Sequence, residues 1–194
     1  LGGNWAHSYG GGMYLISSSP VLDNNSFIRN GASQQGGGLY GIDHSSPMLT
    51  NNILSGNRAQ EGGGIFCQGF SSPTLTNNML NGNTASYGGG AIHCRSYSSP
   101  VLANNVLSGN SAQSGAGMYC IDQSSPTLSN NTLSGNRATT NGGGMYCSSY
   151  SHPTLTNNVL SRNIANNGGG IYCSYDSSPT LMNTILDDNT ARFL

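Results

Sequence analysis

The sequence predicts a parallel β-helix, a fold in which successive turns of short strands stack along one axis. A glycine triplet and a proline each recur at steps of 26 or 27 residues along the whole chain, and a repeat of this length is typical of solenoids. The segments between them alternate apolar and polar side chains, as strands do. The spacing of Gly and Pro leaves no room for a regular helix.

One turn of the repeat is GGGIFCQGFSSPTLTNNMLNGNTASY, from Gly62 to Tyr87. A partial turn covers residues 1–9, and full turns start at residues 10, 36, 62, 89, 115, 142 and 168. We interpret residues 1–194 as one solenoid domain of about seven turns, with no linker and no inserted domain.

Each turn is expected to hold three short strands, which in the turn above begin near Gly64, Thr74 and Met79. Period-two alternation directs Leu75 and Leu80 into the core. Read from turn to turn, these positions become two apolar columns, and a third column of alanines marks a corner. The columns are Leu22, Leu49, Leu75, Leu102, Leu128, Leu155 and Leu181; Phe27, Leu54, Leu80, Leu107, Leu133, Leu160 and Leu186; and Ala6, Ala32, Ala59, Ala85, Ala112, Ala138, Ala165 and Ala191.

Asparagines recur at two further positions that we expect to face inward. A buried amide can donate to one neighbouring turn and accept from the other, so a column of them satisfies its own polar groups. Asparagine also tolerates the left-handed backbone that tight bends need. The first predicted ladder is Asn24, Asn51, Asn77, Asn104, Asn130, Asn157 and Asn183, and the second runs from Asn30 to Asn189.

The composition excludes some classes of function. Charged residues make up 7% of the chain, lysine is absent, and the formal net charge is −1. Nucleic-acid binding needs a basic stripe, which this chain lacks. No apolar run approaches the roughly 18 residues of a membrane span, and no signal peptide opens the sequence.

The segment LSGNRAQEGGGIFC, from Leu54 to Cys67, resembles the paired FxxN and GGAI motifs of polymorphic outer membrane protein repeats. The wider pattern SSPTLTNNxLSGN is similar to right-handed parallel β-helix repeats of bacterial surface and secreted proteins. The sequence departs from the motifs by Leu in place of Phe in every turn but the first, and by a third glycine. The resemblance covers essentially the whole chain and implies a right-handed solenoid at the cell surface or outside the cell. Such repeats serve adhesins, spacers and polysaccharide enzymes alike.

Five cysteines share one inward position in consecutive turns: Cys67, Cys94, Cys120, Cys147 and Cys173. We expect buried, reduced thiols that act as small apolar side chains. A disulfide between in-register neighbours is disfavoured because both Cβ atoms point the same way. A linear metal–thiolate array is the less favoured alternative, and neither a metal site nor a cofactor is predicted.

Six aromatic residues and one histidine occupy the outward position of the first strand: Tyr14, Tyr40, Phe66, His93, Tyr119, Tyr146 and Tyr172. We call this set the strand column. One interpretation is stacking that stiffens the sheet. The other is a contact stripe for sugar rings, a membrane component or a partner protein, widened by His44, Phe70, Tyr97 and Tyr150 on the neighbouring bend.

No catalytic residues are predicted. Enzymes of this fold place carboxylates and bases on adjacent turns. Here Asp43 and Asp122 share a position but lie three turns apart, roughly 14 Å at the usual strand spacing. Glu61 is the single glutamate, and the four histidines fall at different phases of the repeat.

The predicted function is therefore a non-enzymatic structural or adhesive solenoid outside the cell. The alternative is a carbohydrate-binding or polysaccharide-processing β-helix that uses the outward aromatic stripe. The expected partner is a second copy bound end to end, with glycans or a cell-surface protein as the alternative. Solenoids that stay monomeric carry polar capping turns and blunted strand edges, whereas both ends here are rich in apolar residues. The candidate end contacts are Leu1, Asn4, Trp5, Asp187, Asp188, Phe193 and Leu194.

Overall fold

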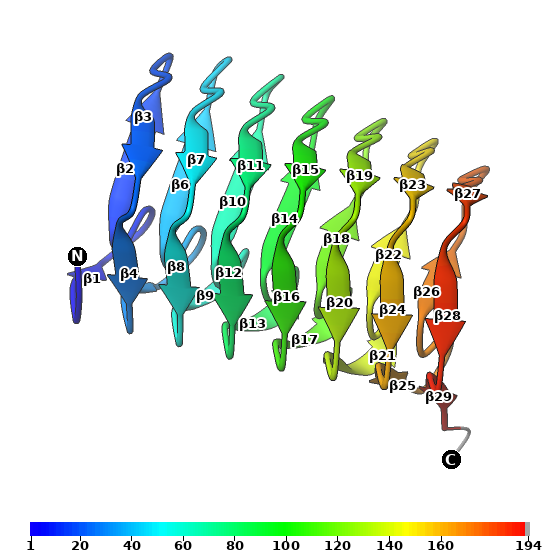
Figure 1. The fold of residues 1–194 in the computed structure, drawn as a ribbon. Coiled ribbons are helices and arrows are strands. Elements are labelled where there is room, and N and C mark those ends of the chain that lie inside the picture. The colour runs from blue at the N-terminus through cyan, green and yellow to red at the C-terminus, as the bar shows by residue number, and fades with distance from the viewer. Residues whose placement is uncertain (193–194) are drawn as a thin grey trace.

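The computed structural model describes residues 1–192 and shows a single row of stacked turns from β1 to β29 (Figure 1). Every strand pairing in it is parallel and joins one turn to the next, as in Cys67 with Cys94. The predicted parallel solenoid is confirmed. No helix in residues 1–192 is long and apolar enough to cross a membrane. The candidate contacts Phe193 and Leu194 lie outside the described residues.

Two of the four sheets contain the glycine-rich strand and the proline-led strand of each turn. The first consists of β2 (Met13–Ile16), β6 (Leu39–Ile42), β10 (Ile65–Gln68), β14 (Ile92–Arg95), β18 (Met118–Cys120), β22 (Met145–Cys147) and β26 (Ile171–Cys173). The second consists of β3 (Val21–Asp23), β7 (Met48–Thr50), β11 (Thr74–Thr76), β15 (Val101–Ala103), β19 (Thr127–Ser129), β23 (Thr154–Thr156) and β27 (Thr180–Met182).

The third sheet follows the asparagine pair of each turn, and the fourth carries the alanine column. The third consists of β4 (Ser26–Ile28), β8 (Ile53–Ser55), β12 (Met79–Asn81), β16 (Val106–Ser108), β20 (Thr132–Ser134), β24 (Val159–Ser161) and β28 (Ile185–Asp187). The fourth consists of β1 (Trp5–Ala6), β5 (Gly31–Ala32), β9 (Arg58–Glu61), β13 (Thr84–Gly88), β17 (Ser111–Ser114), β21 (Arg137–Asn141), β25 (Ile164–Ala165) and β29 (Thr190–Ala191).

The fourth sheet corrects the prediction of three strands per turn. In β9, Ala59 is buried between exposed Arg58 and Gln60, which is the alternation of a strand. Its inward residue is only an alanine, because the sheet packs closely against the glycine triplets. A Cβ on Gly63 would lie 2.5 Å from the carbonyl oxygen of Thr84. The triplets therefore allow this close approach of backbone to backbone.

The two predicted leucine columns form the core. In the middle of the stack Leu75, Leu80, Leu102 and Leu107 are completely buried, whereas Leu186 in the last described turn is 51% exposed. Each leucine packs between identical neighbours in the adjacent turns. Burial of such a side chain stabilises by roughly 1.5–3 kcal/mol, so the stack gains its stability turn by turn.

The second asparagine ladder is buried as predicted. In Asn110 the side-chain amide donates to Oδ1 of Asn136 at 2.9 Å and to the carbonyl of Leu80 at 3.0 Å. The backbone N–H of Asn83 and its amide donate to Oδ1 of Asn110 in turn. The members of this ladder are Asn30, Asn57, Asn83, Asn110, Asn136, Asn163 and Asn189.

The first asparagine ladder was predicted one residue too early. The predicted members are all exposed and hold a left-handed backbone, and they are Asn24, Asn51, Asn77, Asn104, Asn130, Asn157 and Asn183. The second asparagine of each pair builds the ladder instead: the Asn105 amide donates to Oδ1 of Asn131 at 3.0 Å. The tight bend needs one residue with a left-handed backbone. The first asparagine of the pair takes this conformation, and its side chain therefore points outward.

Candidate functional site

The strand column is one continuous stack of rings. Tyr119 and Tyr146 have ring centroids 4.6 Å apart with planes 4° from parallel, and Tyr40 and Phe66 are 5.3 Å apart at 3°. The backbone register that sets this spacing aligns each ring with the corresponding residue in the next turn. The predicted stacking is therefore present on both sides of His93, whose ring is tilted by 44° against Phe66 and by 46° against Tyr119.

The strand column is not an exposed contact stripe, which corrects the second interpretation. Phe66 and His93 are completely buried, Tyr40 and Tyr119 nearly so, and Tyr14 in the first full turn is exposed. The remaining two members, Tyr146 and Tyr172, are half-buried. The side chains do point away from the main core, but other residues cover them.

The cover comes from the segment before each glycine triplet. Tyr9 stacks on Tyr40 with centroids 5.0 Å apart, and Tyr87 meets Tyr119 edge-on at 6.1 Å. A Cβ on Gly88 would approach the ring of Tyr119 to 2.9 Å. The left-handed glycine that follows, such as Gly89 with φ +70°, turns this segment back over the sheet. A second, outer core results.

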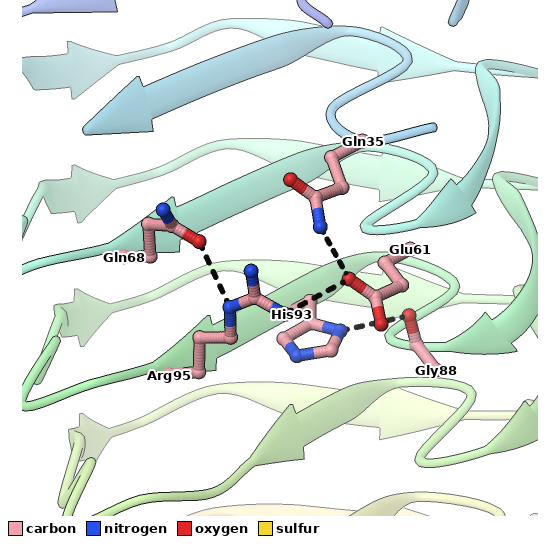
Figure 2. A network of polar contacts seen from close by, with 6 residues as sticks. All are labelled: Gln35, Glu61, Gln68, Gly88, His93 and Arg95. Carbon is pink, nitrogen blue, oxygen red and sulfur yellow. Dashed lines mark hydrogen bonds and ion pairs between the residues drawn. The ribbon is translucent and has the colours of Figure 1, made fainter. Parts of the chain in front are cut away.

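A polar strap closes the middle of the strand column (Figure 2). Arg95 donates through Nε to Gln68 at 2.8 Å and forms an ion pair with Glu61 at 3.4 Å. Gln35 donates to the same carboxylate at 2.7 Å. The guanidinium carbon of Arg95 lies 5.1 Å from the ring centroid of Phe66. Side chains from four turns are thereby joined across the column.

His93 lies between Phe66 and Tyr119, with ring centroids at 4.8 and 4.7 Å. Its Nδ1–H donates to the carbonyl of Gly88 at 3.3 Å, while its buried Nε2 has no partner (Figure 2). Burial lowers the pKa of His93 to about 3, against the opposing effect of the Gly88 hydrogen bond. The ring is therefore neutral near pH 7, and with no exposed surface it cannot meet a substrate.

A second aromatic stack remains exposed on the bend after the first strand. His44 stacks on Phe70 with centroids 5.3 Å apart, Phe70 stacks on Tyr97 at 5.0 Å, and Gln123 donates to the Tyr97 hydroxyl at 2.9 Å. Tyr150 lies two turns beyond Tyr97 and is 58% exposed. We call His44, Phe70, Tyr97 and Tyr150 the bend column. All four have φ between 60° and 63°, a region that bulky residues rarely adopt.

The cysteines lie in one column of directly paired positions. Cys67, Cys94, Cys120 and Cys147 are buried, Cys173 is half-buried, and all five are free thiols. Burial raises the pKa of Cys94 well above its usual value.

The two carboxylates that share one position of the repeat do not come together. Asp43 and Asp122 are exposed and three turns apart, and no cluster of three or more His, Cys, Asp or Glu residues is placed to hold a metal ion in the described part of the chain. Two shallow depressions of about 450 and 330 Å³ lie on the fourth sheet. They are lined by Ala85, Ser86, Ser111, Ala112, Gln113 and Thr139, and by Trp5, Ala32, Ser33, Arg58, Ala59, Gln60 and Ser86.

The candidate end contacts lie at both ends of the row of turns. Leu1 and Trp5 are 59% and 62% exposed, and Trp5 covers the backbone of Gly31. Asn4 extends the second asparagine ladder through its bond to Asn30 at 2.9 Å. At the other end Asp187 and Asp188 are exposed.

A buried serine column was not predicted from the sequence. From the second full turn on, the serine two residues before the proline points inward, and its Oγ accepts the backbone N–H of the preceding turn, as Ser98 does from Ser71 at 3.0 Å. Recurrence of SSP in nearly every turn was the available signal. The members are Ser45, Ser71, Ser98, Ser124, Ser151 and Ser177.

The stacked parallel turns and the asparagine ladders define the class as a parallel β-solenoid. The family model described as "Right handed beta helix region" matches residues 2–107 and 63–192, so the chain belongs to the right-handed β-helix family. That family spans both enzymes and non-enzymes. No match was found among curated proteins or among solved structures.

Proposed function

We propose that the chain is a non-enzymatic structural and adhesive solenoid that works at the cell surface or outside the cell. It associates end to end into a fibre or continues a longer surface stalk. The observation that carries this proposal is that both ends of the described stack leave edge strands of the same sheets unpaired, and that one end face also exposes the last leucines of both columns. The surface location rests on the resemblance of the repeats to those of bacterial surface proteins.

The end faces have the features of a continued stack. The edge strands are β2, β3 and β4 at one face and β26, β27 and β28 at the other, and they belong to the same three sheets. Leu181 and Leu186 are 43% and 51% exposed, whereas their counterparts in the central turns are fully buried. An axial neighbour would cover these leucines and complete the parallel ladders. A head-to-tail contact of this kind is heterologous and propagates into a filament.

Negative-stain electron microscopy of the chain at increasing concentration tests end-to-end association. We expect fibres or axial multiples of the rod. Leu181→Lys with Leu186→Lys places two charges on one end face and should abolish them. The matched control is Met48→Lys with Val101→Lys, because these residues are similarly exposed, at 52% and 45%, but lie on the flank of the stack. Discrete short rods at every concentration would overturn end-to-end association.

Contact with sugar rings is the second candidate, and the bend column favours it over the strand column. Its aromatic rings are exposed and are held in an unfavourable backbone conformation in several turns. Such conformations tend to occur at functional sites. A glycan array should then show binding that is lost in Tyr97→Ala and Tyr150→Ala but retained in Val101→Ala. If the unmodified chain binds no glycan, sugar binding is overturned and only the structural role remains.

A further inference from the structure

Two opposite edges of the stack carry charges of opposite sign. On the bend after the first strand there are three exposed aspartates, Asp43, Asp122 and Asp176. On the outer side of the fourth sheet there are three exposed arginines, Arg58 in β9, Arg137 in β21 and Arg192 directly after β29. Figure 1 shows these bends at the top of the row of turns and the fourth sheet at its bottom. None of the six forms an ion pair within residues 1–192, where the ion pair present joins Arg95 to Glu61.

The two sets of charges occupy the same turns. Three full turns hold one aspartate and one arginine each: Asp43 and Arg58 in the second, Asp122 and Arg137 in the fifth, and Asp176 and Arg192 in the seventh. The equivalent positions in the third, fourth and sixth turns are uncharged, such as Tyr97 and Ser111 in the fourth. Because the strands of every sheet pair from turn to turn, the aspartates and the arginines repeat with the same spacing along the axis.

The uncharged turns are complementary in shape. Phe70 and Tyr97 stack 5.0 Å apart on the bends of the third and fourth turns and are 53% and 47% exposed. On the fourth sheet, the depression of about 450 Å³ extends from the third turn to the fifth, and its lining side chains are short, such as Ala85, Ser111 and Thr139. The stacked rings of one chain and the hollow of another therefore lie at the same height along the axis.

We propose that a second copy of the chain docks side by side, with its axis parallel and its turns in register. The bends of one copy then meet the fourth sheet of the other, and Phe70 and Tyr97 enter the hollow. Three ion pairs form at once: Asp43 with Arg58, Asp122 with Arg137, and Asp176 with Arg192. With one axis reversed, at most two of the three pairs can form, because the second, fifth and seventh turns are unevenly spaced.

The two surfaces are different, so the contact is heterologous and repeats from copy to copy into a row of parallel rods. This contact extends an array across the stack, whereas the end-to-end contact extends it along the axis, and neither requires the other. Single exposed ion pairs contribute little and are screened by salt. Docking is therefore expected to need several pairs together and to weaken at high ionic strength.

Sedimentation velocity of the full chain tests side-by-side docking. Every sample carries Leu181→Lys with Leu186→Lys, which blocks one end face, so that association along the axis does not contribute. We expect species larger than one chain at an ionic strength of about 0.01 M, where the Debye length is about 30 Å, and single chains at about 1 M, where it is about 3 Å. Single chains at low ionic strength and at every protein concentration would overturn the proposal.

Charge reversal identifies the two surfaces. Arg58→Glu with Arg137→Glu, or Asp43→Arg with Asp122→Arg, places like charges at the contact and should leave single chains. An equimolar mixture of the two folded variants should associate again, because each reversed surface then meets a surface of opposite charge. A mixture that stays dispersed would overturn the proposal.

The matched control for the bend variant is Asp23→Arg with Asp187→Arg, which changes the net charge by the same amount. Both aspartates are exposed, but they lie in β3 and β28, on the second and third sheets. This variant should associate as the parent chain does. Circular dichroism identifies the variants that fold. Equal loss of association in this control would contradict a contact specific to the two surfaces.

A zero-length crosslink tests the register and needs no reversed charge. The chain has no lysine, so Arg58→Lys with Arg137→Lys, as the only substitutions, supplies two unique side-chain amines. A carbodiimide joins an amine to a carboxylate in contact with it. Mass spectrometry of isotopically distinct copies should find position 58 linked to Asp43 and position 137 linked to Asp122. Links of position 58 to Asp122, or no link between copies, would overturn the proposal.

Discussion

The strand column and the bend column are built alike and differ in what covers them. Both place stacked rings in successive turns, with centroids 4.6 Å apart for Tyr119 and Tyr146 and 5.0 Å apart for Phe70 and Tyr97. Phe66 is completely buried, whereas Phe70 is 53% exposed. Stacking alone therefore does not determine whether an aromatic column forms a surface. Exposure is determined by the segment before the glycine triplet, because that segment folds over the strand column and not over the bend column.

The backbone differs as well. Members of the strand column lie in regular strands, such as Tyr119 in β18. Tyr97 in the bend column has φ 62°, which costs a bulky residue on the order of 1–2 kcal/mol. The buried strand column therefore stabilises the fold, and the unfavourable backbone of the bend column offsets part of that stabilisation. Substitutions in the two columns should therefore change the free energy of unfolding by different amounts.

The largest difference is expected between Phe66→Ala and Phe70→Ala. Removal of the buried ring of Phe66 should lower the free energy of unfolding by about 3–5 kcal/mol. Phe70→Ala, on the exposed bend, should lower it by less than about 1 kcal/mol. Urea denaturation of both variants measures the difference. Similar losses would mean that the two columns are equally buried.

Acid should destabilise the strand column through His93. Because its folded pKa is about 3, below the ordinary histidine value of 6.5, the unfolded chain binds the proton more strongly. The stabilisation is complete above pH 6.5 and is lost as the pH falls towards 3, by on the order of 3 kcal/mol at pH 4. His93→Phe should remove this part of the pH dependence of the urea midpoint.

The neighbouring asparagines Asn104 and Asn105 repeat the contrast between exposed and buried positions. Asn105→Ala removes the oxygen that accepts from both the backbone N–H and the side-chain amide of Asn78 and should cost about 1–3 kcal/mol. Asn104→Gly keeps the left-handed bend and should change the free energy of unfolding by less than about 0.5 kcal/mol. Thermal melts of both variants compare them. A larger loss for Asn104→Gly would contradict the corrected ladder.

The smallest effect is expected for Tyr97→Asn. Asparagine adopts the left-handed backbone at lower cost than tyrosine, and this gain offsets the lost stacking on Phe70. The free energy of unfolding should stay within about 0.5 kcal/mol of the parent value. Tyr97→Val is the matched test of the backbone, since a β-branched residue is strongly disfavoured there. A stable Tyr97→Val variant would show that the bend is not constrained.

Much of the fold followed from the sequence because each feature recurs in nearly every turn. The leucine columns and the Asn30-to-Asn189 ladder needed only the period of the repeat and strand alternation. The first ladder was displaced by one residue, because Asn104 and Asn105 are chemically identical and only the φ of the bend separates them. The fourth strand was missed, since its inward residue is an alanine such as Ala59 rather than a large apolar side chain.

Burial of the strand column could not be predicted in the same way. Alternation correctly placed Phe66 and His93 on the side of the strand away from the leucines. It does not show whether another segment returns over that side. The return depends on left-handed glycines such as Gly89 and on the varied residues Tyr9, Gln35 and Tyr87 that precede the triplets. Because these residues differ from turn to turn, they form no repeating pattern from which the covering segment could have been predicted.

The most direct test of the difference between the columns is the rate at which each tyrosine is nitrated in the native chain. Nitration proceeds through the phenolate and needs solvent access. Burial raises the pKa of Tyr40 to about 12 and also raises that of Tyr119. Peptide mass spectrometry should find rapid modification of Tyr97 and Tyr150, and modification of Tyr40 and Tyr119 only after denaturation. Equal rates at Tyr119 and Tyr97 in the folded chain would contradict a covered strand column beside an exposed bend column.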